Sequence, residues 1–362
     1  MIYASMTRRG LAAFALAAGT AMAGTAHAAD PMKIGFVHVG PIGDGGYTFQ
    51  HHLSAEAVKK EFGDKVKVTE VENVPEGPDA ERVITQLAQD GNKIIFTTSF
   101  GFMNPTLKAA AQFPEVKFEH ATGFKTADNM ANYNIRFYEG RYVVGLLAGK
   151  LTKSNTIGYI ASFPIPEVVM GINAAYLGAK KANPNVKMKI IWVNTWFDPG
   201  KEGDAAKALI DQGADVLMQH TDSAAAVKVA AEKGLWAVGQ SSDMAHFAPD
   251  NVITSIADNW APYVVGRVKA AMDGSWKTGS VWQGMKEGAV EIPAINKKVP
   301  EDVRKLAETA MADIAAGKLH PFTGPLKKQD GSDWLADGKT APDGDLLGMG
   351  FYVQGIEGEL PK

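Results

Sequence analysis

Polar and aromatic side chains stand directly after five apolar, β-rich runs of this sequence. They are Asp44 and Tyr47, Ser99 and Phe100, Trp196 and Phe197, His220 and Asp222, and Asp243. If the runs are parallel strands, their carboxyl ends converge on one crevice. Rings beside acceptor-only carboxylates suit a small planar solute with N–H or O–H donors. Any single position has a plainer explanation, such as Asp44 capping a helix on which Tyr47 packs. The ligand site is therefore predicted by the recurrence of such residues after five strand-like runs, and not by any one position.

The glycine-rich loop after the first run is not a complete dinucleotide fingerprint. Gly43 and Gly45 have the required spacing, but Thr48 stands where the third glycine is needed. This loop therefore does not favour a nicotinamide or flavin, and we expect no cofactor.

Signatures of catalysis are also missing. The nearest approach to a nucleophile elbow, Gly239-Gln-Ser-Ser-Asp243, lacks the final glycine, and the chain has no cysteine for thiol chemistry. His51 and His52 are adjacent, so on a helix they would point in different directions and form a poor metal pair. His38 and His220 lie at strand ends, where either one could touch a ligand. We expect a binding protein without a metal site rather than an enzyme.

Strand-like and helix-like segments alternate from residue 33 onward, which predicts parallel sheets with helices on both faces. The first set has strands at 34–39, 66–71, 93–97, 116–120 and 131–135, with helices ending near 62 and at 79–89, 104–112 and 139–151. The second set has strands at 156–160, 187–193, 216–218, 236–238 and 252–255, with helices at 166–181, 200–212 and 223–233. Helices at 260–272 and 300–316, an edge strand or hairpin at 287–292 and a last strand at 349–353 follow. Two successive sets predict two doubly wound lobes.

The first 28 residues have the pattern of a signal peptide. Thr7-Arg8-Arg9 precedes an apolar run over 11–23 and the small-x-small site Ala26-His27-Ala28, so we expect cleavage after Ala28. The paired arginines do not separate general from twin-arginine export. The remaining chain is long enough for about two domains.

Composition narrows the class of partner. The formal net charge is −3, which argues against nucleic acid, and no second apolar run is long enough to span a membrane. The absence of cysteine excludes both disulfides and a lipid-anchored cysteine after the signal. We expect a soluble, freely diffusing periplasmic protein.

Five motifs, read together, resemble one family. They are Ile34-Gly-Phe-Val37 with Gly43-Asp44-x-Gly46-Tyr47; Glu139-Gly-x-Tyr142-x-x-Gly145; Trp196-x-Asp198-Pro-Gly-Lys201; Asp211-x-Gly213-Ala-Asp215; and Gly239-x-x-x-Asp243. The chain resembles the basic membrane protein (BMP, PnrA-like) family of ABC-transporter solute-binding proteins, most closely its purine-binding branch. Tyr47 stands where that branch usually carries Trp.

The resemblance implies a type I periplasmic binding protein fold, with the ligand closed between two lobes that are joined by three crossovers. Lobe 1 is expected to comprise 29–152 with about 258–280 and 318–362, and lobe 2 to comprise 153–257 with about 281–317. A purine would lie between Tyr47 and Phe100 on one side and Trp196 or Phe197 on the other.

The resemblance also implies the polar contacts and the partners. Asp222 and Asp243 would accept hydrogens from the ligand, Lys286 matches a family lysine that reaches it, and Asp44 or Asn134 would complete the rim. The expected partners are a purine (adenine, guanine, hypoxanthine or a nucleoside) and an inner-membrane ABC permease, with the protein itself monomeric. A sugar-binding protein, a chemosensory protein and a periplasmic nucleoside hydrolase stay open as alternatives.

Overall fold

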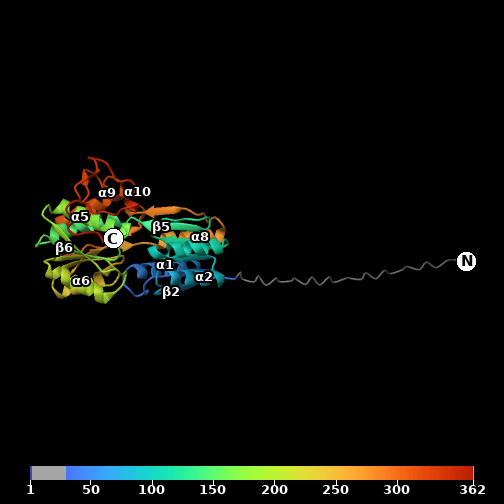
Figure 1. Ribbon diagram of the computed structural model, residues 1–362. Helices are drawn as coiled ribbons and strands as arrows, with labels where there is room; N and C mark the ends of the chain where they lie inside the picture. The colour runs from blue at the N-terminus through green and yellow to red at the C-terminus, as the bar shows by residue number, and fades with distance from the viewer. Residues whose placement is uncertain (2–29, 362) are drawn as a thin grey trace. The chain divides into compact units, whose positions relative to one another are not determined.

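The computed structural model describes Met1 and residues 30–361 (Figure 1). The predicted signal peptide and its cleavage site lie outside the described residues. Within the part of the chain that the structure describes, no helix combines the length and apolarity needed to cross a membrane.

The first sheet contains six parallel strands in the order β12-β5-β4-β3-β1-β2. Their bounds are β1 Met32–Val37, β2 Val66–Val71, β3 Ile94–Thr97, β4 Lys117–Ala121, β5 Met130–Ile135 and β12 Ser280–Gln283. Alternate residues of a strand face opposite sides. Phe36 and Phe96 therefore face α1 (Tyr47–Phe62) and α8 (Ala261–Asp273), whereas Ile95 faces α2 (Pro78–Gln89) and α3 (Met103–Gln112). Both faces are covered, as near-continuous apolar strands predict.

The second sheet contains five parallel strands in the order β10-β9-β8-β6-β7. Their bounds are β6 Thr156–Ala161, β7 Lys187–Trp192, β8 Val216–His220, β9 Trp236–Gly239 and β10 Val252–Ser255. One face packs on α6 (Pro199–Asp211) and α7 (Ala225–Glu232) through a core that includes Leu209, Leu217 and Val227. The other face packs on α4 (Phe137–Leu151) and α5 (Pro166–Ala182). This arrangement confirms the predicted α/β class with doubly wound parallel sheets.

Helix α4 belongs with the second sheet by its contacts, although the sequence analysis placed it in the first lobe. It packs lengthwise on α5, and Arg141 donates from it to the backbone carbonyl of Gln219 in β8. Strand β12 shows the opposite difference. The sequence analysis assigned most of it to the second lobe, but it pairs with β5 at the edge of the first sheet. Helix packing places α4 and sheet pairing places β12, and neither can be seen in the one-dimensional pattern.

Three passages connect the two sheets. The chain leaves the first sheet after β5, returns after β10 through β11 (Ala257–Asp258) and α8, and leaves again after β12. The third passage carries the short 3₁₀ turn η4 (Met285–Glu287) and β13 (Val290–Glu291), which pairs antiparallel with β11. It continues to α9 (Glu301–Ala315), which packs on α4.

The C-terminal segment is ordered but is not the strand that was predicted for 349–353. It holds β14 (Leu326–Lys327), β15 (Asp333–Leu335) and α10 (Asp343–Leu347), and Val353 forms only an isolated bridge to Lys328. The segment packs on α5, where the Asn173 amide bonds to backbone groups of Phe351 and Val353. It is therefore tied to the second half of the molecule, although the sequence analysis assigned it to the first lobe.

Glycines set the close approach of α4 and α5. A Cβ on Gly145 would overlap the backbone carbonyl of Ala175, and one on Gly178 would overlap that of Tyr142.

We therefore expect Gly145→Ala to destabilise the protein by about 1–3 kcal/mol, because the helices must separate. Gly266→Ala is the matched control, since Gly266 lies in α8 and a Cβ added there would meet nothing within 4 Å. It should stabilise by roughly 0.5–1 kcal/mol. Urea unfolding of both variants measures the difference, and equal effects would contradict this account of the packing.

Candidate functional site

A cavity lies at the carboxyl ends of both sheets and encloses about 360 Å³ of empty space, part of it open to solvent. Its wall residues are Val39, Tyr47, Ser99, Phe100, Thr122, Phe137, Glu167, Trp196, His220, Asp222 and Gln240. They follow β1, β3, β4 and β5 of the first sheet and β6, β7, β8 and β9 of the second. A ring-rich wall with a few convergent polar groups is typical of small-molecule sites.

Tyr47 enters the cavity from the first turn of α1, and Asp44 holds that turn in place. The Asp44 carboxylate accepts backbone N–H groups from Gly46, Thr48 and Phe49 at 2.8–2.9 Å. Burial raises the pKa of Asp44, and these three donors oppose the increase. Asp44 does not line the cavity, so it acts as a cap that positions Tyr47.

Trp196 enters from the loop after β7. Its ring lies 5.1 Å from that of Phe163, and its indole N–H donates to Glu76, which follows β2, at 3.3 Å. The backbone carbonyl of Trp196 also accepts from the N–H of Asp222 at 3.0 Å. Trp196 is thus fixed by contacts from both sheets. Phe197 lines a neighbouring hollow on the other side of Trp196 rather than the cavity itself.

The polar wall is formed by buried groups with few partners. Glu167 is near the start of α5, and its Oε1 lies 3.7 Å from Nε2 of His220. Among the described residues, neither Oε2 of Glu167 nor Nδ1 of His220 has a hydrogen-bond partner. Burial raises the pKa of Glu167 to about 8, although the Asn134 amide and the charge of Arg141 act to lower it. Burial and Arg141 lower the pKa of His220 well below its usual value, so this imidazole is neutral.

Two further acids near this wall also favour the protonated form. Burial and the neighbouring charge of Asp44 raise the pKa of Asp222, which lines the cavity, well above its usual value. Burial does the same to the pKa of Asp258 on β11. Hydrogen-bonding groups that are held out of water cost free energy until something pairs with them. A ligand with polar atoms on its edge would supply those partners.

The structure brings together four of the nine residues predicted for the site. Tyr47, Phe100, Trp196 and Asp222 line the cavity. Asn134 is buried in β5, where its Oδ1 accepts from the backbone N–H of Ile135, and it is near Glu167 without being part of the wall.

Asp243 and Lys286 are both exposed and lie outside the wall. Asp243 caps the 3₁₀ turn η3 (Met244–Phe247) through the N–H of Ala245 at 3.0 Å. Lys286 lies on η4.

Sequence reasoning missed Glu167 and Phe137. Glu167 resembles an ordinary acid in the first turn of a helix, where acids are favoured by the helix dipole. Its position just after β6 was the available signal. His220 was recognised as a strand-end residue, and the structure places it in the cavity wall.

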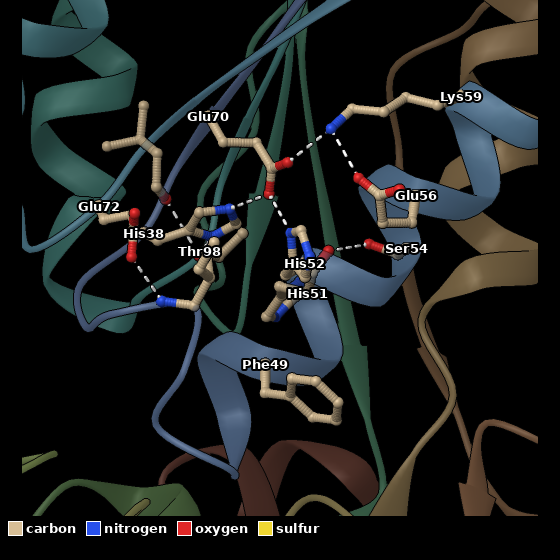
Figure 2. A network of polar contacts seen from close by, with 12 residues as sticks. His38, Phe49, His51, His52, Ser54, Glu56, Lys59, Glu70, Glu72 and Thr98 are labelled. Carbon is tan, nitrogen blue, oxygen red and sulfur yellow. Dashed lines mark hydrogen bonds and ion pairs between the residues drawn. The ribbon is translucent and has the colours of Figure 1, made fainter. Parts of the chain in front are cut away.

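A second polar cluster lies away from the cavity and is shown in Figure 2. Glu70 of β2 accepts from His38 and His52 and from Lys59 at 3.0–3.2 Å, and Lys59 also bonds to Glu56 at 2.6 Å. His52, Glu56 and Glu70 are close enough to share a metal ion. Lys59 already bonds to both carboxylates and balances one of their two negative charges, so the oxygens that would bind a metal ion are engaged by the protein itself. The cluster therefore gives no support to a metal site.

The adjacent histidines differ in environment, as predicted. His51 is buried and stacks on Trp260 with ring centroids 4.7 Å apart, whereas His52 faces Glu70.

The two doubly wound sheets, with a cavity at their strand ends, have the type I periplasmic binding protein fold. An ABC transporter solute-binding protein of Aeropyrum pernix K1 superposes with a TM-score of 0.69, at 20% sequence identity, over 82% of this chain and 93% of that one. Residues 32–316 match the family described as ABC transporter substrate-binding protein PnrA-like, and the chain belongs to this family.

Two relatives carry names that describe a ligand. A purine-binding protein of Brucella abortus (strain 2308) is 56% identical over 348 residues, which cover 96% of this chain and 99% of the relative. A protein of Haloferax volcanii named as a putative ABC transporter glucose-binding protein is 35% identical over 92% of this chain and 82% of its own length.

The Glu70 cluster predicts a specific response to acid. Burial opposes ionisation of Glu70, but the hydrogen bonds from His38, His52 and Lys59 outweigh it and lower the pKa to about 2. A carboxyl with a lowered folded-state pKa stabilises the fold above its unfolded pKa, near 4.5, and this contribution is lost as the pH falls toward 2. Glu70→Gln should therefore cost about 1–2 kcal/mol at neutral pH, a value reduced for the partial exposure of its partners. The gap to the unmodified protein should close near pH 2. Urea unfolding across this pH range tests it, and a gap that does not change with pH would contradict it.

Proposed function

We propose that this substrate-binding protein takes up a purine nucleobase or nucleoside in the cavity between its two sheets and delivers it to an ABC importer. The observation that carries the proposal is a cavity walled by rings from both sheets, in which the acid Glu167 has an oxygen without a hydrogen-bond partner among the described residues. A purine has two π faces for the rings and an edge of donors and acceptors for the acids. The 56% identity to a protein named as purine-binding supports the same ligand class.

In this proposal the rings hold the base and the polar wall orients it. Tyr47 and Phe100 contribute from the first sheet, and Trp196 from the second, as the sequence analysis expects. Phe137 adds a fourth ring that was not predicted. Asp222, Glu167 and His220 supply the polar contacts. We propose no turnover of the ligand, so incubation with inosine should release no free base.

The site of action follows from the same proposal. A binding protein of an importer meets its permease at the outer face of the inner membrane, so we place this protein in the periplasm. The sequence has no cysteine to carry a lipid, which favours a protein that diffuses freely.

A sugar is the second candidate, because the 35% identical relative is named for glucose. Sugars also bind through rings and carboxylates, so the ligand class requires a direct test. Purified protein heated with nucleobases, nucleosides and sugars should show a raised melting temperature with purines, since a ligand that binds only the folded state stabilises it. Stabilisation by sugars alone would overturn the purine assignment.

Trp196 provides the sharpest test of the ring wall. Trp196→Ala should weaken purine binding roughly 5- to 150-fold, because the loss of one stacking ring costs about 1–3 kcal/mol. Trp196→Phe keeps a ring but removes the hydrogen bond to Glu76, and should lose only a few-fold, since such a bond contributes about 0.5–1.5 kcal/mol. Isothermal titration calorimetry measures both.

Asp243→Asn and Lys286→Met are the controls for this series, because both side chains are exposed outside the cavity wall. They should bind the purine with unchanged affinity. A loss in either control that equals the loss in Trp196→Ala would show that the cavity has been assigned to the wrong residues.

A further inference from the structure

Glu167 is the acid on the cavity wall that is least supported by protein contacts. Only 12% of its side chain is exposed, yet its Oε2 is buried without a hydrogen-bond partner among the described residues, and only the Asn134 amide and the charge of Arg141 favour its ionised form. Asp44 and Asp222 differ in this respect, whereas both carboxylate oxygens of Asp258, which does not line the cavity, also lack a partner among the described residues. Asp44 accepts three backbone N–H groups, and Asp222 is supported by the backbone N–H of Tyr47.

No positive charge among the described residues neutralises Glu167 directly. Arg141, a buried cation close to it, directs its terminal nitrogens to the carbonyl of Gln219 and to the side-chain oxygen of Gln240. His220 lies 3.7 Å away but is a neutral imidazole, because burial and Arg141 lower its pKa. The other titratable groups that act on this position are Tyr47 and Asp258, and burial raises the pKa of each so that both favour their neutral forms.

A buried carboxylate without a cation or hydrogen-bond donors is strongly disfavoured, so such a group takes up a proton instead. A neutral carboxylic acid then offers one O–H donor and one carbonyl acceptor side by side. This is the same pattern as a side-chain amide, which pairs with the exocyclic amino group and the adjacent ring nitrogen of adenine. At the corresponding N7 edge guanine presents two acceptors, N7 and O6, which do not match it.

We propose that Glu167, as a neutral carboxylic acid, reads the N7 edge of the bound base, and that a base held in this orientation is accepted as a 6-aminopurine in preference to guanine. This inference rests on the proposed function, because it needs a purine in the cavity. The acid donates its proton in a hydrogen bond to a ring nitrogen of the base, and its carbonyl oxygen accepts from the 6-amino group. The proton stays on the oxygen of the acid, so none is transferred to the base.

The protonation of Glu167 gives the inference a measurable signature. With a pKa of about 8, the acid is neutral below this value and ionises above it. The ionised carboxylate has two acceptors and no donor, so it faces the ring nitrogen with a second acceptor. At about pH 9.0, roughly one molecule in ten keeps the proton, and adenine affinity should fall about tenfold from its value at about pH 6.5. At about pH 6.5, adenine should bind more tightly than guanine.

Calorimetry with adenine across this pH range is the experiment, with Glu167→Gln as the decisive variant. Glutamine keeps one donor and one acceptor but does not titrate, so it should retain adenine binding within a few-fold and lose the alkaline decline. Glu139→Gln is the matched control. Glu139 is also a buried acid with a pKa raised by burial, but it lies outside the cavity wall, so this variant should keep the pH profile of the unmodified protein.

The possible outcomes separate the two proposals. If no purine binds at any pH, the proposed function fails. If purines bind but the adenine profile is flat, if Glu167→Gln keeps the decline, or if guanine binds more tightly than adenine in mild acid, the role of Glu167 is overturned and the proposed function stands. If Glu167→Gln does not fold by circular dichroism, the profile of the unmodified protein and its preference between the two bases still decide the question.

Discussion

The structure depends on keeping several acids out of water without giving them cations. Glu167, Asp222 and Asp258 are all buried or nearly so near one crevice, and burial raises the pKa of each. In the interior of a protein an ionised pair or an unpaired charge is expensive, whereas a neutral acid needs only hydrogen-bond partners. The crevice is therefore polar in composition but close to neutral in charge. An uncharged planar solute is the kind of ligand that such a wall can hold without transferring an ion out of water.

The packing of α4 on α5 places this wall. The two helices approach at Gly145 and Gly178, where any side chain would meet the backbone of the partner helix. This close contact fixes Arg141 on one helix and Glu167 at the start of the other. Arg141 bonds to backbone and amide oxygens of the second sheet, so its charge acts on Glu167 and His220 only at a distance. The same packing that stabilises the fold thus decides that the acid is left neutral.

The alternation of apolar runs and helical segments predicted the two parallel sheets and the ring-bearing strand ends, because side-chain period and element length are local properties. The lobe to which α4 and β12 belong could not be predicted from these local properties, because α4 is placed by helix packing and β12 by sheet pairing. The polar wall was the least predictable part. Glu167 has the sequence signature of a helix-start acid, and only its depth in the structure distinguishes it from a solvated one. Asp243 and Lys286 illustrate the converse, because a motif match carries no information on whether a side chain faces a cavity or solvent.

Contacts across the crevice bear on how a ligand enters. The hydroxyl of Ser242 donates to the carbonyl of Gly45, the indole of Trp196 donates to Glu76, and Gly46 lies against the backbone of Asp222. Each joins a loop of the first sheet to a loop of the second, and together they cover the rings that would hold a base. Separation of the sheets to admit a ligand would break these contacts, and closure would form them again. The three passages between the sheets, where β11 pairs with β13, are the segments that must bend. Closure over the ligand would bring the loops of both sheets into one surface, which is the surface that a permease could recognise only in the loaded state.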